Sequence, residues 1–123
     1  MALFSKSLCH FDITQKFIVP IDWLGSLLPS IEQNSEATIS VVGQNGSEHA
    51  FVLRTRKIKD DQPYLKPVFQ NRGWLQFVRA DRLRVDETVY FWKERRGNED
   101  IIRVQVRDRP NIHVLMGFAI EFK

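Results

Sequence analysis

Residues 71 to 92 read NRGWLQFVRADRLRVDETVYFW, and the spacing of the apolar residues changes within this stretch. Trp74, Phe77 and Val78 occupy positions i, i+3 and i+4, which lie on one face of a helix. From Leu83 onward the apolar residues alternate, which is typical of strands with one buried face. The sequence therefore predicts a short amphipathic helix that is joined to strand-like chain by a tight corner.

Asp86 and Glu87 interrupt the alternating pattern just after this corner. Leu83 and Val85 lie before the interruption, and a second alternating run begins after it at Val89. Aspartate tolerates turn and left-handed backbone conformations better than most residues other than glycine. We therefore expect two strand-like runs with a turn at Asp86.

Alternating runs and turn residues recur along the rest of the chain. Hairpins are expected around 43–46 (GQNG) and 97–98 (GN), because glycine and asparagine favour hairpin turns. Residues 10–20 predict a strand, a short polar break and a second strand that ends at Pro20. Residues 21–29 predict a brief helix, and residues 67–70 predict a short strand after a polar loop.

The last segment, about 112–122, predicts a terminal strand with one apolar face. That face comprises Val114, Met116, Phe118, Ile120 and Phe122. A face of this kind must be buried, either by closing a barrel or by meeting another chain. A protein partner or a homodimer through this strand is therefore an open possibility.

The count is seven or eight short strands and two short helices, which favours a barrel-like β-rich domain over a parallel α/β sheet. The 123 residues suffice for a single domain with one core. Cys9 is the only cysteine, which excludes an internal disulfide and a multi-cysteine zinc site and favours a reducing, intracellular compartment. The N-terminus lacks the apolar region of a secretory signal and no apolar run reaches the length of a bilayer span, so we expect no membrane role.

Candidate catalytic and metal-binding groups are scattered. His10, His49 and His113 have no partner at a spacing that would place two ligands on one face. No nucleophile elbow, P-loop or dinucleotide fingerprint is present. The carboxylate pairs lie at predicted turns, where we expect them to be solvated: Asp60-Asp61, Asp86-Glu87 and Glu99-Asp100. We expect no enzymatic activity, no cofactor and no metal.

The charge is unevenly distributed. The net charge is only +3, but residues 54–109 hold 15 of the 18 Lys and Arg and 9 of the 15 acidic residues. This part of the chain therefore carries +6, and the remainder carries −3. The excess indicates either an ordinary solvated surface or a surface for a polyanion.

The segment GWLQFVRADRLRVDETVYFW is similar to a pattern of Gly-Trp, two variable residues, Phe-Val and then Leu-x-x-Gly-Asp-x-x-x-Phe. With KFIVP and the short helix expected after it, the chain resembles the plant B3 DNA-binding domain family over about residues 8–108. The resemblance implies a seven-stranded open β pseudobarrel with two short helices. It also implies two arms that enter the DNA major groove, one between the first two strands and one in the loop that leads to the fifth.

By position, the first arm falls on residues 14–16 and the second on residues 59–66. The DNA-binding residues that the resemblance implies are Thr14, Gln15, Lys16, Arg54, Arg56, Lys57, Lys59, Gln62, Tyr64 and Lys66. Lys and Arg neutralise phosphates, Arg can pair with guanine and Gln with adenine, and Tyr can contact sugar or phosphate. Any one of these residues would also be ordinary in a solvated loop.

The chain departs from the family pattern at two pairs of acidic residues. Asp86-Glu87 replaces Gly-Asp, and Asp60-Asp61 places two negative charges inside the second arm, where they repel phosphate. The resemblance implies a nuclear, non-enzymatic, sequence-specific double-stranded DNA-binding domain of a transcriptional regulator. One alternative is a protein-interaction module on the same pseudobarrel that has lost DNA binding. Another is the recognition domain of a nuclease.

Overall fold

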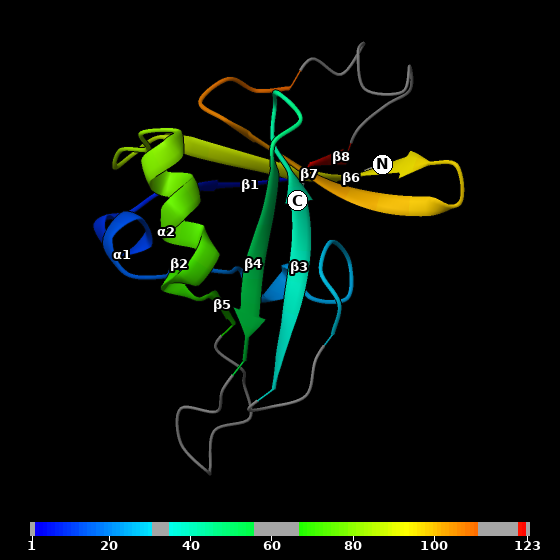
Figure 1. The fold of residues 1–123 in the computed structure, drawn as a ribbon, viewed down its shortest axis with the longest axis horizontal. Coiled ribbons are helices and arrows are strands. Elements are labelled where there is room, and N and C mark those ends of the chain that lie inside the picture. The colour runs from blue at the N-terminus through cyan, green and yellow to red at the C-terminus, as the bar shows by residue number, and fades with distance from the viewer. Residues whose placement is uncertain (1, 31–34, 56–66, 111–120, 123) are drawn as a thin grey trace.

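Eight strands form one curved sheet in the order β2-β5-β4-β3-β7-β6-β1-β8 (Figure 1). The computed structural model describes residues 2–30, 35–55, 67–110 and 121–122. The strands are β1 (Ala2–Ser7), β2 (Phe17–Ile18), β3 (Glu36–Val42), β4 (Glu48–Arg54), β5 (Val68–Phe69), β6 (Thr88–Arg96), β7 (Glu99–Val106) and β8 (Glu121–Phe122). The helices are α1 (His10–Thr14), the 3₁₀ turn Ile21–Trp23 and α2 (Asn71–Ala80).

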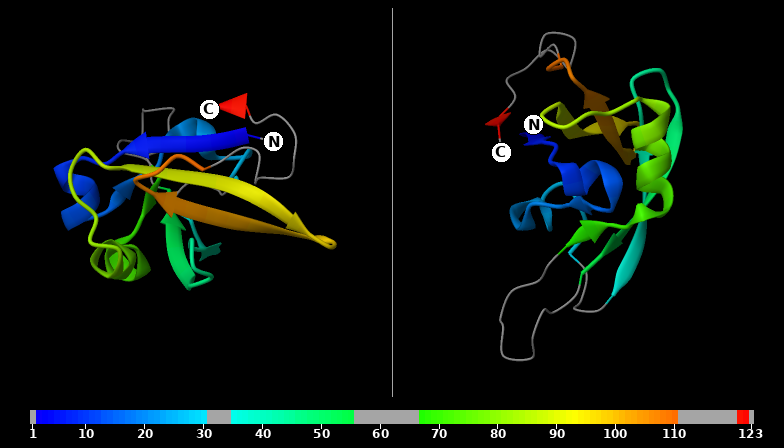
Figure 2. Two further views of the ribbon diagram at one scale, coloured as in Figure 1. Left: turned by 90° about the horizontal axis from the view of Figure 1, so that it is seen from above. Right: turned by 90° about the vertical axis from the view of Figure 1, so that its left-hand side faces the viewer.

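Strands β1 to β7 and the two α-helices make the open pseudobarrel that the sequence predicts. Most neighbouring strands are antiparallel, while β3–β7 and β1–β8 are parallel. The sheet does not close, because β2 and β8 lie at its two edges. Helix α2 lies alongside β4, and the β6–β7 hairpin projects away from the barrel (Figure 2).

Both predicted hairpins are confirmed. Strands β3 and β4 pair from Glu36↔Arg54 to Val42↔Glu48, and the turn between them is closed by the Gly43 amide, which donates to the Ser47 carbonyl at 2.7 Å. Strands β6 and β7 pair up to Arg96↔Glu99 around the turn at 97–98. The glycine and asparagine signals therefore identified the turns correctly.

Aromatic rings fill the centre of the barrel. The Phe17 and Trp74 ring centroids lie 4.6 Å apart, and those of Phe51 and Phe69 lie 5.1 Å apart. Phe91 of β6 contacts Phe17 and is fully buried, as is Trp74. The predicted burial of the Trp74 face of α2 is confirmed, so this helix closes the core against β4.

Two predictions near the N-terminus are wrong. Residues His10–Thr14 form helix α1 rather than a strand, and the first strand is Ala2–Ser7, which pairs with β6. The helix expected over 21–29 is reduced to the turn Ile21–Trp23, because Leu24 is extended and bridges to Leu28. The first strand of the sheet therefore lies before the segment in which it was expected.

The strand-like run 83–85 is also wrong. Residues 83–85 form no strand, and the chain turns on both sides of them, at Arg82 and Asp86, whose φ angles are 52° and 72°. Leu83 is buried, but Val85 is 42 % exposed, so the alternation does not mark a buried face here. The predicted turn at Asp86 is confirmed, and β6 begins only at Thr88.

The predicted C-terminal strand falls mostly on residues 111–120, which lie outside the described residues. Within the described part, β8 pairs in parallel with β1 through Ala2↔Glu121 and Leu3↔Phe122. The C-terminal end of the chain therefore adds a short eighth strand beside the first.

Candidate nucleic-acid interface

Arg54 lies on the outer face of the sheet, at the end of β4. Its neighbour Leu53 is fully buried, so the alternation of a strand directs Arg54 outward, and the Arg54 side chain is exposed. Arg54 pairs with Val68 of β5 and with Glu36 of β3. Glu36 is exposed, so the Arg54 cation has one carboxylate as a cross-strand neighbour.

The first predicted arm lies between β1 and β2, and its first residue, Thr14, is the last residue of α1. Thr14, Gln15 and Lys16 are all exposed. The Thr14 hydroxyl donates to the His10 carbonyl at 2.8 Å, and the Gln15 amide donates to the Phe11 carbonyl at 2.9 Å. The backbone of this arm is thus held by local hydrogen bonds, while the polar ends of the side chains face solvent.

Strand β5 connects the two groups of residues in space. It pairs with β2 through Phe17↔Phe69 and with β4 through Leu53↔Phe69. Lys16 directly precedes β2, and Arg54 is the last residue of β4. The structure therefore places Lys16 and Arg54, which are far apart in the sequence, on either side of β5. The register puts Arg54 level with Val68 and Ile18, so the two cations lie near opposite ends of this short strand.

The remaining predicted contacts of the second arm are Arg56, Lys57, Lys59, Gln62, Tyr64 and Lys66, and they lie outside the described residues, as do Asp60 and Asp61. The two ends of that loop are described. The Thr55 amide donates to the Ser35 carbonyl at 3.1 Å, and the Pro67 carbonyl accepts a hydrogen bond from the Val19 amide at 3.0 Å. Both ends are fixed to the barrel, and the second end is tied to the chain that follows β2.

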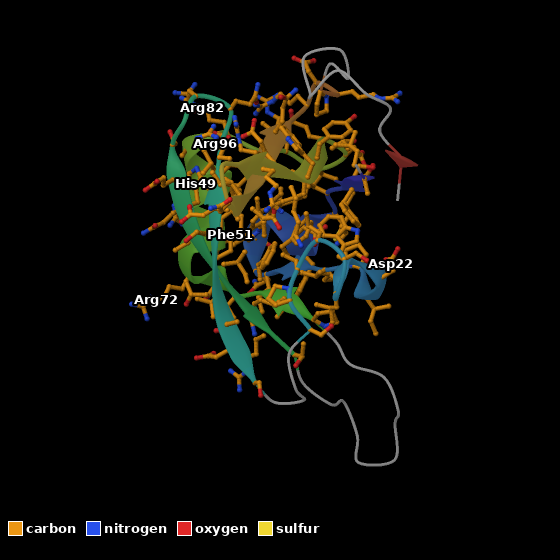
Figure 3. All side chains as sticks on the ribbon, turned by 90° about the vertical axis from the view of Figure 1, so that its right-hand side faces the viewer. Asp22, His49, Phe51, Arg72, Arg82 and Arg96 are labelled. Atoms are coloured by element: carbon orange, nitrogen blue, oxygen red, sulfur yellow. The ribbon has the colours of Figure 1, made fainter. Side chains whose placement is uncertain are left out.

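Arg72 is a candidate that the sequence interpretation did not include. It is exposed at the kinked start of α2, and Figure 3 shows its side chain directed away from the barrel. The Trp74 indole N–H, two residues later, donates to the Asp12 carbonyl in α1 at 2.6 Å, so this end of α2 lies beside the first arm. The only signal in the sequence was a basic residue directly before Gly-Trp.

Several other cations of the described chain already have acidic partners. Arg103 pairs with Glu94 at 2.9 Å, Arg96 pairs with the same carboxylate at 3.2 Å, and Arg107 pairs with Glu87. Within the described residues, Lys16, Arg54 and Arg72 form no salt bridge. Arg79, Arg82, Arg84 and Lys93 are also exposed and form no salt bridge among the described residues. We define Lys16, Arg54 and Arg72 as the basic rim because of their position: Lys16 lies in the first arm, Arg54 at the base of the second, and Arg72 at the end of α2 beside the first arm.

Asp12 lies beneath the first arm and is fully buried. Burial alone would raise the pKa of its carboxyl group, but hydrogen bonds from the Cys9 and Ile18 amides and from Lys6 outweigh burial and leave the pKa below its usual value. The carboxylate is therefore ionised and fully engaged in holding the chain around it.

The histidines and the metal-ligating residues offer no second site within the described part of the chain. His10 is exposed, and the His49 ring packs edge-on against Phe77 at 4.9 Å between centroids, as expected for surface and packing residues; His113 lies outside the described residues. No group of three or more His, Cys, Asp or Glu residues gathers among the residues that the structure describes. A search of the same residues finds no helix with the length and apolar character needed to cross a membrane.

No protein-family model and no curated protein matches the sequence. Among solved structures, the chain is similar to the protein in an Arabidopsis FUS3–DNA complex, with a TM-score of 0.71 and 20 % sequence identity. The match covers 87 % of this chain and 97 % of that chain. This chain has the same fold as FUS3. At this level of identity the similarity extends to the architecture, and the bound DNA is a property of the FUS3 structure.

Proposed function

We propose that this protein is a nuclear, non-enzymatic transcriptional regulator that binds double-stranded DNA sequence-specifically through two arms in the major groove. The structure of FUS3, whose fold this chain shares, was solved as a DNA complex. In this chain, the first arm and the base of the second flank the same short strand, β5.

The basic rim is the observation that carries the proposal. Lys16 directly precedes β2 and Arg54 ends β4, the two strands that flank β5. Neighbouring strands are about 4.8 Å apart, and the register offsets the two residues by two positions, about 6.7 Å, along the strands, so the two positions are separated by roughly 12 Å. The B-DNA major groove is about 12 Å wide. Arms that begin at these positions can therefore enter one groove together, while the rim cations contact the phosphates that border it.

The residues of the two arms have two kinds of role: some position the protein on the DNA backbone, and others recognise the base sequence. Lys and Arg supply a phosphate affinity that is independent of sequence and decreases with salt. Gln15 in the first arm and Gln62 in the second carry amides that can pair with adenine, and an arginine of the second arm can pair with guanine. We infer that the base contacts come from the arms and that the rim fixes the orientation of the duplex.

A second candidate function is a protein-interaction module. Two observations favour it: Asp60 and Asp61 lie inside the predicted second arm, and the two-residue strand β8 lies at an edge of the sheet. An edge strand offers unpaired backbone groups to another chain. On this reading the partner, or a second copy, pairs with the C-terminal strand and DNA is not bound.

A selection from random duplexes, followed by titration of the enriched sequence at several salt concentrations, tests the proposal. We expect one enriched motif, and an affinity that decreases linearly with the logarithm of salt concentration. Arg56→Ala and Lys66→Ala should each weaken binding while the protein stays folded. A protein that enriches no sequence and binds duplexes no better than a neutral protein would favour the interaction module.

A further inference from the structure

The Asp12 carboxylate closes the first arm at both ends. It accepts a hydrogen bond from the Cys9 amide, before the arm, and another from the Ile18 amide, after the arm, both at 2.9 Å. Cys9 and Ile18 bound the segment that contains Thr14, Gln15 and Lys16. One carboxylate therefore sets the distance between the start and the end of the arm.

Lys6 connects this carboxylate to the sheet. Its ammonium group donates to Asp12 Oδ1 at 2.9 Å and to the Ile18 carbonyl at 2.6 Å, and it lies 4.7 Å from the centre of the Phe17 ring. Lys6 belongs to β1 and is paired there with Val89 of β6. The arm is thus fixed to β1, which lies beside β6 in the sheet, as well as to β2.

Helix α2 provides a third attachment. The Trp74 indole N–H donates to the Asp12 carbonyl oxygen at 2.6 Å, and Trp74 itself is fully buried in the core. The side chain and the backbone of Asp12 therefore bind groups from β1, β2 and α2. Among the described residues 9–18, Asp12 is the one buried polar or charged residue, whereas the arm residues 14–16 are exposed.

We propose that Asp12 and Lys6 are positioning residues that hold the first arm in the geometry in which it contacts DNA, an inference that rests on the proposed function. The two side chains are buried or half-buried and do not reach the solvent-facing ends of the arm. They act by removing freedom from the arm before binding. An arm that is ordered only in the complex loses affinity, because the cost of ordering it is then subtracted from the contacts it makes.

The hydrogen bonds that the Asp12 carboxylate accepts can be tested with one conservative substitution, Asp12→Asn. The Asp12 carboxylate accepts from two backbone amides, those of Cys9 and Ile18, and from the Lys6 ammonium group, and the Cys9 thiol is a further hydrogen-bond partner. All of these groups can donate. The amide of Asn has nearly the same shape, but its NH₂ group cannot accept, so at least one of the donors loses its partner in Asp12→Asn. The variant changes the hydrogen bonding without removing volume from the core.

The test combines hydrogen exchange with a double-mutant cycle on the duplex enriched by selection. In Asp12→Asn, we expect faster exchange of the Ile18 amide and about tenfold weaker DNA binding, which corresponds to about 1.4 kcal/mol. We also expect the effect of Lys16→Ala to shrink to within about twofold in the Asp12→Asn background, because Lys16 is then no longer held in place. Arg54→Ala is the matched control and should keep its full effect in both backgrounds.

A purely structural role for Asp12 gives a different result. If Asp12→Asn only unfolded part of the protein, the apparent affinity would decrease in proportion to the fraction that remains folded. Lys16→Ala and Arg54→Ala would then each reduce the affinity by the same factor in the Asp12→Asn background as in the wild type, and this result would overturn the proposal. If Asp12→Asn does not fold, Lys6→Met removes the ammonium group and keeps the packing over Phe17, and it should give the same pattern with a smaller loss. Additivity in that variant would equally overturn the proposal.

Failure of the proposed function has its own signature. If the wild-type protein enriches no duplex, both the proposed function and the positioning role of Asp12 and Lys6 are contradicted. If the wild-type protein binds DNA and the cycle with Lys16→Ala is additive, only the positioning role fails.

Discussion

Gly73 lies directly against the backbone of Ala50. A Cβ atom at position 73 would stand 2.1 Å from the Ala50 carbonyl oxygen, and the φ angle of Gly73 is +83°. Both features require glycine: the first because helix α2 packs closely on β4, and the second because L side chains rarely adopt this conformation. This contact gives a physical reason for the glycine of the Gly73-Trp74 pair.

Gly73→Ala should therefore destabilise the protein severely. Backbone strain costs roughly 1–3 kcal/mol, and the clash with Ala50 adds to it because the neighbouring atom is backbone and cannot rotate away. The control is Gly46→Ala: Gly46 has the same φ of +83° but no atom within 4 Å of a Cβ. Urea unfolding of both variants measures the difference, and an equal loss would show that the approach to Ala50 is unimportant.

The basic rim should determine how binding responds to salt. Lys16→Ala and Arg54→Ala should each weaken duplex binding and lower the salt slope by about 1, if each side chain neutralises one phosphate. Lys93→Ala is the matched control, since Lys93 is an exposed cation on the projecting β6–β7 hairpin. Titration at several salt concentrations measures the slopes. Equal slopes for all three variants would remove the rim from the interface.

The Asp12 carboxyl group should make stability depend on pH in the acidic range. Its pKa in the folded protein is below its usual value of about 3.9. Its contribution is therefore complete above about pH 4, and it is lost as the pH falls through the lower folded-state pKa. Wild-type protein should lose stability on acidification more steeply than Asp12→Asn, which has no proton to take up at this position.

Unfolding by urea at a series of acidic pH values compares the two proteins. The control Asp22→Asn removes an exposed carboxylate and should lose stability on acidification as the wild type does. Parallel curves for wild type and Asp12→Asn would mean that the hydrogen bonds to Asp12 do not favour its charged form.

The acidic pair of the second arm should weaken DNA binding. Asp60 and Asp61 lie outside the described residues, and the prediction follows from their place in the sequence between the arm's cations. Charges within a Debye length of roughly 10 Å at 0.1 M salt repel phosphate. Asp60→Asn combined with Asp61→Asn should therefore strengthen duplex binding, most clearly at low salt, with little change in melting temperature.

Gel-shift titrations at low and high salt check this prediction. An unchanged affinity at low salt would indicate that the loop does not approach the DNA backbone. A loss of binding to a protein partner, with no DNA binding in either protein, would support the interaction module.

Local patterns were sufficient where the local chain determines the structure. The spacing of Trp74, Phe77 and Val78 predicted α2, and turn residues predicted both hairpins, because periodicity and turn chemistry are properties of neighbouring residues. Helix α1 was missed because it is only five residues long, too short to show a helical period. It is held by Lys6 from the preceding strand and by Trp74, which is 62 residues away from Asp12, and a contact over such a separation leaves no local pattern.

The candidate site was only partly predictable for the same reason. Lys16 and Arg54 could be proposed as cations in arms, but their proximity depends on β5, which inserts between β2 and β4 although it follows both in the sequence. The strand expected at 83–85 failed because alternation does not reveal the left-handed backbone of Arg82 and Asp86. Side-chain polarity indicates which face of a segment is exposed to solvent, but it does not indicate the sign of the backbone φ angles.

The pairing of β1 with β6 has a consequence for the order in which the newly made chain can fold on the ribosome. Phe4 is opposite Phe91, so the first strand has no partner until most of the protein has been synthesised. The β3–β4 hairpin can form as soon as both of its strands have emerged from the ribosome. Leu3 and Phe4, which are both buried in the folded protein, remain exposed to solvent until β6 has been synthesised. During translation β1 therefore stays exposed, and accessible to chaperones, for longer than the strands of the β3–β4 hairpin.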